Sequence, residues 1–470
     1  RFVRRDVKCV LREWGRNRLQ ELLPVIEVYK LLREAFRGGN VHANRYFVKN
    51  PEFPLPPIEN VHSADISSSY PSQQVENKFP MTPFKHVEKA VTYSQLKEHY
   101  IQRRGYALIF RMEVSNIKMR DKFNPCPYLS FDKCRSVRGK VLDNGRILSA
   151  DHIETTVTDI DFQILDKQYN LSDDNVVIKD LYFAAYGYLP DQLRELVKDY
   201  YTQKTTLKGI PEQQLYYDKF KNLINACYGC SAQDPAKDNI LYIEEPEEGK
   251  EIYQNEGLEL IDILNDARPT MPYQWGVWTT ARARERLQLL IDKVHEAPDS
   301  EFVYTDTDSV KYIGEYDLEE VNRELREIAI QNKAYADDIK GQRHYMGIYE
   351  YEGMYKRFET LGAKSYVYED DACRLHITIA GVPKKAGALE LERMGGFSAY
   401  KTGAIFHDGI TETRYNDKRQ LTDTVIDGHK LELTSNLVIQ PNQHQIGFAN
   451  DYSILLSTLT KDDIEKIRKL

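Results

Sequence analysis

The sequence predicts a mixed α+β protein in which short strands alternate with amphipathic helices. Three stretches support this fold class. Residues 302–312 read as two short β-branched and aromatic strands joined by a polar turn, residues 24–36 keep apolar side chains at helical spacing, and residues 106–114 alternate apolar and polar side chains like a half-buried strand. Strand and helix signals therefore occur along the whole chain.

Length and charge limit the classes of function. With 470 residues and 41% hydrophobic side chains, the chain can form several domains with substantial cores, and no run approaches a membrane span. The net charge is −8, so any DNA-binding surface must be a local basic patch. Six cysteines show no paired framework and no signal peptide precedes them, which indicates a reducing cytoplasm.

The first predicted helix follows a basic stretch at residues 1–6 and ends at Gly38 and Gly39. The turn at Arg37-Gly38-Gly39 has two readings that the sequence leaves open. It is either a helix cap with a solvated arginine, or a place where glycines let the backbone approach phosphates closely.

Carboxylates end two of the predicted strands. Asp65 precedes a Ser-rich turn closed by Pro71, and Asp306 and Asp308 lie at the tip of the predicted hairpin. Alternation places Asp306 and Asp308 on one side of the backbone, where they repel each other unless a cation lies between them. An Asp-Thr-Asp turn can also serve only its own backbone. Because Asp65 and Asp308 come from different segments, they can supply the pair that a two-metal phosphoryl-transfer site needs.

A predicted helix between these segments carries groups suited to a nucleotide. Lys221, Asn225 and Tyr228 fall on one face at helical spacing and offer a cation, an amide and an aromatic ring. Taken alone, the segment also reads as an ordinary amphipathic helix capped by Gly229.

Three of these segments, taken in order, resemble the palm and fingers motifs of family B DNA polymerases: 65–71, 221–229 and 304–309. Two more, 36–39 and 364–366, resemble motifs of the protein-primed branch found in phages and mobile elements. The resemblance covers about residues 30–410. One departure is Ser69, which stands where the family pattern has leucine and loosens the expected packing beneath Tyr70.

The resemblance implies a right-hand polymerase fold with an antiparallel palm sheet, helical fingers, a small β-rich thumb and two insertions. The expected division is a remnant or linker from an upstream exonuclease region at 1–40, palm at 41–83, an insertion of the terminal-protein-contacting type at 84–180, fingers at 181–233, a second, acidic insertion at 234–272, palm at 273–383 and thumb at 384–470. The end of the first insertion, near residues 153–166, is expected to return to the palm sheet. The metal-binding segments of the relatives' exonuclease domain are not recognised, so we expect no proofreading in this chain.

The resemblance also implies a DNA-directed DNA polymerase that extends a primer 3′-hydroxyl by two-metal-ion nucleotidyl transfer, in the replication of a phage or mobile element. The implied metal site holds two Mg²⁺ ions, with Mn²⁺ as a substitute, on Asp65, Asp308 and the Ile66 carbonyl, with Asp306 in a supporting catalytic role. The implied nucleotide-binding residues are Tyr70, Lys204, Lys221, Asn225 and Tyr228. The implied DNA-binding residues are Arg37, Gly38, Gly39, Lys364 and Tyr366.

Two other classes stay open at this point. A catalytically inactive DNA-binding subunit would keep the fold, although all three aspartates are present, and another palm-type enzyme such as a primase would start without a primer. The sequence leaves the priming mode open between a terminal protein, an ordinary DNA primer and no primer. We expect a monomer that binds primer–template DNA and dNTPs in the bacterial or phage-infected host cytoplasm, without a membrane partner.

Overall fold

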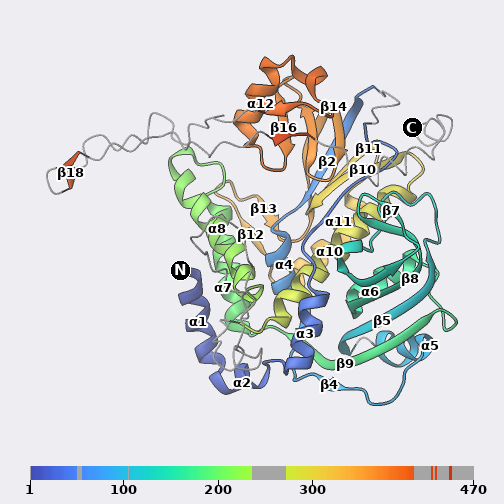
Figure 1. Ribbon diagram of the computed structural model, residues 1–470. Helices are drawn as coiled ribbons and strands as arrows, with labels where there is room; N and C mark the ends of the chain where they lie inside the picture. Colours follow the sequence, from blue (N-terminus) through green and yellow to red (C-terminus); the bar gives the residue numbers. More distant parts are fainter. Residues whose placement is uncertain are drawn as a thin grey trace.

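The computed structural model describes residues 2–49, 56–103, 105–234 and 271–406, with three short segments at 425–426, 429–430 and 444–446. Two antiparallel sheets lie beside each other, and a pair of long helices stands on the other side of the molecule from the second sheet (Figure 1). The predicted α+β class is confirmed.

The first sheet, which we call the palm sheet, has the strand order β1-β10-β11-β2-β14-β15-β16 and only antiparallel pairs. Its strands are β1 (Asn40–Ala43), β10 (Ser300–Thr307), β11 (Ser309–Gly314), β2 (Ile58–Ile66), β14 (Tyr349–Gly362), β15 (Ser365–Glu369) and β16 (Leu375–Ile379). The predicted hairpin is β10 and β11. Because β2 pairs with β11, Asp65 lies directly opposite Ser309.

Helices cover one face of the palm sheet. α10 (Gln274–Glu296) and α11 (Glu319–Gln331) place Leu287, Ile291 and Leu325 in one core cluster with Ala64 and Val310 of the sheet. The short helix α4 (Ser69–Glu76) starts directly after β2 and packs on α10, α7 and α8.

The paired helices are α7 (Asp191–Thr206) and α8 (Gln214–Ser231), which we call the fingers hairpin; a short 3₁₀ turn, η3 (Pro211–Gln213), joins them. α7 starts at the predicted position after Pro190. α8 differs from the prediction because it continues through Gly229 to Ser231 instead of ending there. A glycine inside a helix costs about 1 kcal/mol relative to alanine, which tertiary packing can offset.

Residues 2–35 form helices rather than a linker. They are α1 (Phe2–Trp14), α2 (Arg16–Glu21) and α3 (Ile26–Ala35). α1 buries Val3, Val7 and Leu11 in the core cluster that also contains Ile224 and Cys227 of α8. The expected remnant at 1–40 is therefore an integral part of the fold.

The second sheet has the strand order β3-β9-β5-β8-β6, with β4 on β9 and β7 on β8. Its strands are β3 (Lys78–Pro80), β4 (Lys85–His86), β5 (Tyr106–Lys118), β6 (Cys134–Arg138), β7 (Val141–Asp143), β8 (Arg146–Thr158) and β9 (Val176–Tyr188). Three short helical segments accompany it, α5 (Tyr93–Gln95), η1 (Leu96–Ile101) and η2 (Phe131–Lys133). The strand predicted at residues 106–114 is part of β5, and Asn144 and Gly145 form the turn between β7 and β8.

The expected return of residues 153–166 to the palm sheet is wrong. β8 pairs with β5, β6 and β7, and residues Asp159–Gln168 form the helix α6, whose Phe162 and Leu165 enter the core of the second sheet. Thr158 caps this helix by accepting a hydrogen bond from the Asp161 N–H, so the strand ends where the cap begins.

The remaining described elements are short. β12 (Tyr335–Asp337) and β13 (Arg343–Tyr345) form a hairpin, and α12 (Lys384–Arg393) and η4 (Gly396–Ala399) follow β16. β17 (Ile405–Phe406) pairs with β20 (His444–Gln445), and β18 (Val425–Ile426) pairs with β19 (His429–Lys430). Most of the expected thumb and acidic insertion lies outside the described residues. Among the described helices, none has the length and apolar character needed to span a membrane.

Candidate active site

The tip of the β10–β11 hairpin holds two of the three predicted carboxylates. Asp306 is opposite Ser309, the Asp308 N–H donates to the Asp306 carbonyl at 2.7 Å, and Thr307 between them has a φ of 66°. Positive φ is uncommon for a β-branched residue, so this turn is held in shape by its surroundings.

Asp65 lies next to Asp308 because β2 and β11 are neighbours. The Ile66 N–H donates to the Asp308 carbonyl at 2.8 Å, which fixes the two segments to each other. Burial, and then the charge of Asp308, raise the pKa of Asp65 well above its usual range. Burial, and then the charge of Asp306, raise the pKa of Asp308. The two carboxylates are therefore half-buried, close together and short of positive charge.

Asp306 has a different environment. The Lys364 ammonium pairs with its carboxylate, and the Thr307 hydroxyl donates to the same oxygen at 3.1 Å. Asp306 consequently has its own cation, whereas Asp65 and Asp308 together lack the positive charge that would balance their two carboxylates. This difference agrees with the supporting role expected for Asp306.

The chemistry of these residues fits a hard divalent cation. Within the described ranges no group of three His, Cys, Asp or Glu side chains is arranged as a metal site. Asp65, Asp308 and the backbone carbonyl of Ile66 nevertheless offer oxygen donors, which Mg²⁺ and Mn²⁺ prefer. A cation between the two carboxylates would remove the repulsion that raises their pKa values.

A cleft of about 530 Å³ opens beside these carboxylates. It brings together most of the predicted metal and nucleotide residues: Asp65, Ile66, Tyr70, Lys204, Lys221, Asn225, Tyr228 and Asp308. They come from β2, α4, α7, α8 and the hairpin tip. On α8, the predicted common face of Lys221, Asn225 and Tyr228 is the face that lines the cleft.

Lys204 is the most enclosed cation of the cleft. Its ammonium donates to the Ser68 hydroxyl at 2.9 Å, and burial lowers the pKa of Lys204 to about 8. Lys204 is half-buried, and a cation that is partly removed from water is stabilised by a nearby negative charge, so an anionic ligand here would be stabilising. Lys204 and Lys221 are both placed to meet such a ligand.

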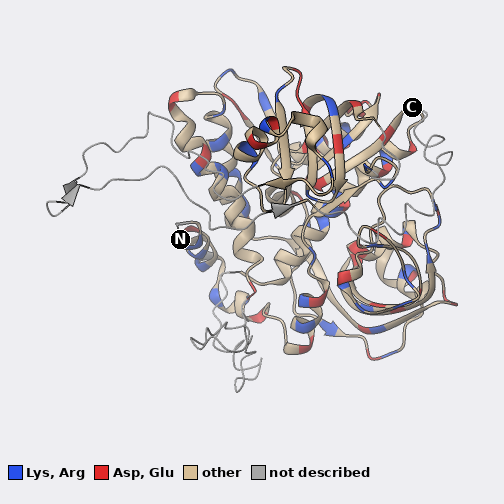
Figure 2. Ribbon diagram, turned by 45° about the horizontal axis from the view of Figure 1, so that its top comes forward, with Lys and Arg blue, Asp and Glu red and all other residues tan. Residues whose placement is uncertain are grey.

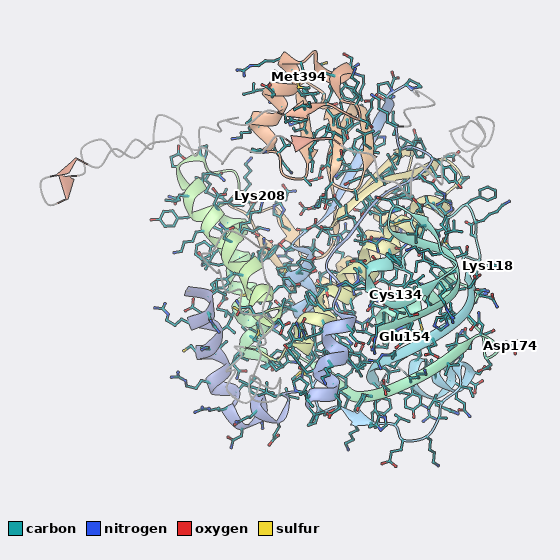
Figure 3. The ribbon with its side chains drawn as sticks, in the orientation of Figure 1. Lys118, Cys134, Glu154, Asp174, Lys208 and Met394 are labelled. Carbon is teal, nitrogen blue, oxygen red and sulfur yellow. The ribbon has the colours of Figure 1, made fainter. Side chains whose placement is uncertain are left out.

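The lining residues of the cleft that were not selected from the sequence include Lys208, His344 and Glu350. Lys208 lies near the end of the fingers hairpin on the side of the palm strands (Figure 3), and its ammonium is 3.9 Å from the Glu350 carboxylate. Its position four residues after Lys204 on the same helical pattern could have indicated it. His344 and Glu350 carry no such local signal because they reach the cleft through long-range strand pairing.

Two aromatic rings stack in the cleft. The rings of Tyr70 and Tyr228 have centroids 4.4 Å apart and an interplanar angle of 23°. Ser69, just before Tyr70, is 4% exposed, and its hydroxyl has no hydrogen-bond partner among the described residues. Tyr70 therefore rests on Tyr228 rather than on a large side chain at position 69.

The Arg37-Gly38-Gly39 segment lies behind the hairpin tip. The Arg37 guanidinium is buried and donates to the Thr156 carbonyl and the Thr155 hydroxyl, both at 3.0 Å. Gly38 is exposed, and Gly39 touches the hairpin so closely that a Cβ would lie 2.6 Å from Thr307 Cγ2. The Arg37 side chain thus bonds within the fold, and Gly38 is the exposed residue of this segment.

Lys364 and Tyr366, both expected from the resemblance to contact DNA, have different environments. Lys364 lies in the turn between β14 and β15 with a φ of 57° and is half-exposed. Tyr366 is 8% exposed and packs on Tyr304 with ring centroids 4.9 Å apart. Because the Lys364 N–H donates to the Tyr304 hydroxyl at 2.9 Å, Tyr366 supports the segment that positions Lys364 beside Asp306.

Comparisons with known proteins agree with this geometry. The family model described as DNA polymerase type B, organellar and viral, matches residues 16–266, a little over half of the chain. Phi29 DNA polymerase has a similar fold, with a TM-score of 0.60, 15% identity and coverage of 87% of this chain and 64% of that chain. Its complex with primer–template DNA matches with a TM-score of 0.60, 14% identity and coverage of 94% and 66%.

A third structure, Phi29 DNA polymerase with primer–template DNA and incoming nucleotides, has a TM-score of 0.59, 15% identity and coverage of 87% and 63%. This chain thus spans just under two thirds of the length of these polymerases. No curated protein sequence matches it significantly. The family match confirms the resemblance drawn from the motifs, and the chain belongs to the organellar and viral type B DNA polymerases.

Proposed function

We propose that this chain is a template-directed DNA polymerase that adds deoxynucleotides to a primer 3′-hydroxyl. One observation carries the proposal: the carboxylates Asp65 and Asp308 and the cations Lys204 and Lys221 line the same cleft. Nucleotidyl transfer needs carboxylates that hold metal ions and cations that face the triphosphate.

The metal site of this proposal consists of Asp65, Asp308 and the Ile66 carbonyl. Two Mg²⁺ ions, or Mn²⁺ in their place, would lower the pKa of the primer 3′-hydroxyl and stabilise the charge on the leaving pyrophosphate. The charge deficit at Asp65 and Asp308 supports this assignment. Asp306 keeps Lys364 at the hairpin tip.

The nucleotide is held by the fingers hairpin and α4. Lys204 and Lys221 meet the oxygens of the outer phosphates as point charges, and Asn225 and Tyr228 support the nascent base pair. Tyr70 stacks beneath the deoxyribose and excludes a 2′-hydroxyl. Its packing on Tyr228 gives that ring a firm position in spite of the small Ser69.

The DNA contacts of the proposal are fewer than the sequence suggested. Lys364 is half-exposed beside Asp306 and suits a primer phosphate near the 3′ end. The exposed backbone at Gly38 suits a template phosphate, with Gly39 as its support on the hairpin. Complexes of Phi29 polymerase with primer–template DNA and incoming nucleotides support the same classes of ligand here.

We assign the enzyme a replicative role in a phage or mobile element, acting as a monomer in the cytoplasm of the host. The protein-primed branch suggested by its motifs makes a terminal protein the proposed natural primer. The active-site residues themselves accept any primer that presents a 3′-hydroxyl, so an oligonucleotide is a valid test substrate.

The test is extension of a labelled DNA primer on a template with four dNTPs and Mg²⁺. The parent chain should extend the primer, Asp308→Asn should abolish extension, and the exposed Asp371→Asn should leave it unchanged as the matched control. Product in a reaction without primer would point to a primase-like enzyme. Absence of extension by folded parent protein would refute the proposal and favour an inactive DNA-binding subunit.

A further inference from the structure

A group of buried charges lies where the second sheet meets the palm. Figure 2 shows basic and acidic residues interspersed over the helices and both sheets. Three of them are enclosed together: Arg284 of α10, Asp161 of α6, and Arg37, which follows α3. We call these three residues the buried charge cluster. Because a buried charge is costly unless it is closely paired, the partners of each charge show what the cluster holds in place.

Asp161 is the anion at the centre of the cluster. Its carboxylate accepts hydrogen bonds from Arg284 Nη2 and from the Thr158 hydroxyl, both at 2.8 Å, and from the Tyr128 hydroxyl. Arg37 Nη1 lies 3.8 Å from the same carboxylate. Burial alone would raise the pKa of Asp161, but the charges of Arg284 and Arg37 lower it to about 2. The carboxylate is therefore ionised near neutral pH and fixes the orientation of the Arg284 guanidinium.

The Arg284 guanidinium joins this carboxylate to the backbone that precedes β1. Its Nη1 donates to the Gly38 carbonyl at 3.0 Å and to the Arg37 carbonyl, and its Nε donates to the Tyr128 hydroxyl at 2.7 Å. All three nitrogen atoms of the guanidinium are thus engaged. A planar group with several fixed donors holds its partners in one arrangement, which a lysine ammonium cannot do. Since β1 begins only at Asn40, this side chain sets the backbone just before the strand.

The next two residues touch the tip of the β10–β11 hairpin. Asn40 lies opposite Thr307 in the pairing of β1 with β10, and a Cβ on Gly39 would lie 2.6 Å from Thr307 Cγ2. Thr307 directly precedes Asp308, and its φ of 66° is uncommon for a β-branched residue, so its conformation depends on support from neighbouring segments. A continuous chain of contacts therefore runs from Asp161, beside the second sheet, to a proposed metal ligand in the palm.

We propose that Asp161 and Arg284 are positioning residues for the metal carboxylates. They hold residues 37–40 against the hairpin tip and thereby fix the place of Asp308 relative to Asp65. This inference rests on the proposed polymerase function, because it assigns the pair a part in nucleotidyl transfer without contact to the nucleotide. Mg²⁺ demands near-ideal ligand geometry, so two carboxylates that share such ions tolerate little change in their separation. A displacement of about 1 Å in an active site can cost on the order of 100-fold in rate.

Helix α6 also supplies a matched control. Asp159 lies two residues before Asp161, is likewise buried, and bonds to the same neighbouring helix α10, which packs on α6 (Figure 1). Among the described residues, its side chain accepts hydrogen bonds from Trp278 Nε1 at 3.2 Å, the Tyr186 hydroxyl at 2.6 Å and the Leu108 N–H at 3.2 Å. These partners lie outside residues 37–40. Asp159→Asn therefore disturbs the junction of α6 and α10 but leaves the support of the hairpin tip in place.

The first test compares Asp161→Asn, Arg284→Lys and Asp159→Asn in steady-state primer extension, each well below its own melting temperature. Asp161→Asn and Arg284→Lys should lower kcat by about 10-fold or more and need several-fold more Mg²⁺ for half-maximal rate. Their KM for dNTPs should stay within about threefold of the parent, because Lys204 and Lys221 keep their places. Asp159→Asn should match the parent in all three quantities. Unchanged kcat in Asp161→Asn, or an equal loss of kcat in Asp159→Asn, would overturn the inference.

The second test needs neither DNA nor metal. Amide hydrogen exchange in a peptide covering residues 304–309 reports on the hairpin tip, where the Asp308 N–H donates to the Asp306 carbonyl at 2.7 Å. Exchange there should be several-fold faster in Asp161→Asn and Arg284→Lys than in the parent, and unchanged in Asp159→Asn. Equal exchange in the parent and Asp161→Asn would overturn the inference. If the parent itself fails to extend a primer, the polymerase proposal is refuted, and the exchange rates decide by themselves whether the cluster positions the tip.

Discussion

Gly39 offers the sharpest test of how the hairpin tip is held. A Cβ at this position would lie 2.6 Å from Thr307 Cγ2 and 2.9 Å from Thr307 Cα. One of these atoms is backbone, so the contact cannot be relieved by rotating a side chain. Gly39 is not among the residues with positive φ, which means that alanine would fit its backbone and only the contact would be changed.

The size of the effect follows from these distances. Carbon atoms in contact lie about 3.5 Å apart or more, so Gly39→Ala must separate the segment from Thr307 by roughly 1 Å. Overpacking of this kind costs about 1–3 kcal/mol of folding free energy. Because Thr307 lies between Asp306 and Asp308, a displacement of about 1 Å at the catalytic carboxylates should lower kcat on the order of 100-fold.

The assay is steady-state primer extension together with chemical denaturation of Gly39→Ala. Gly105→Ala is the control, since a Cβ there would meet nothing nearer than 3.8 Å, and it should keep both the parent activity and the parent stability. Gly39→Ala with kcat within about threefold of the parent would refute the argument, because a shift of that size at the carboxylates cannot leave the rate intact.

Three other predictions concern charge. Without divalent metal, the unfolding free energy should fall as pH rises from about 4, because the folded state holds protons on Asp65 and Asp308 more tightly than the unfolded state. In thermal melting, the melting temperature of Asp65→Asn should depend less on pH than that of the parent. Mg²⁺ should stabilise the parent more at about pH 8 than at about pH 5. Lys204→Met should raise the KM for dNTPs roughly 10-fold or more in steady-state kinetics, because it removes a cation from the phosphate site. Arg37→Ala should lower the unfolding free energy by about 3 kcal/mol in denaturant titration, since it strips a buried pair with Asp161, yet change the Kd for primer–template by less than about threefold in fluorescence anisotropy.

Local sequence was sufficient for the parts of the site that depend on local geometry. The hairpin tip at Asp306 and Asp308 follows from strand–turn–strand patterning, and the common face of Lys221, Asn225 and Tyr228 follows from the helical repeat. The proximity of Asp65 to Asp308 depends on the pairing of β2 with β11. We inferred that Asp65 and Asp308 lie close together from the order of the motifs and because two such carboxylates can hold a shared cation. The periodicity of apolar residues did not indicate it.

Long-range packing is where the sequence analysis failed. Alternation identified β8 as a strand but carried no information about its partner, and β8 pairs within the second sheet instead of the palm. The apolar residues Val3, Val7 and Leu11 formed a helical pattern that was passed over because the segment was read as a remnant. The first error concerns which sheet a correctly patterned strand joins, and the second is a helix that was not recognised.

The same limit applies to arginines, because the sequence alone does not show which of them are buried in ion pairs. Arg284 resembles a candidate phosphate ligand in sequence, but it is 4% exposed and donates to the Gly38 carbonyl at 3.0 Å and to Asp161 at 2.8 Å. Arg286 is likewise buried and pairs with Glu76 at 2.8 Å. A count of arginines from the sequence includes these buried guanidinium groups together with the solvent-exposed ones. The charge of the buried groups is nevertheless already neutralised inside the fold.

Once the buried arginines are set aside, the cations left for phosphates have a clear distribution. Lys204, Lys208 and Lys221 all line the cleft, and the fingers hairpin carries all three. A protein with net charge −8 repels DNA and triphosphates over most of its surface. Under the proposed function, these three lysines and Lys364 beside Asp306 therefore supply the local positive charge that attracts phosphates to the cleft and to the hairpin tip.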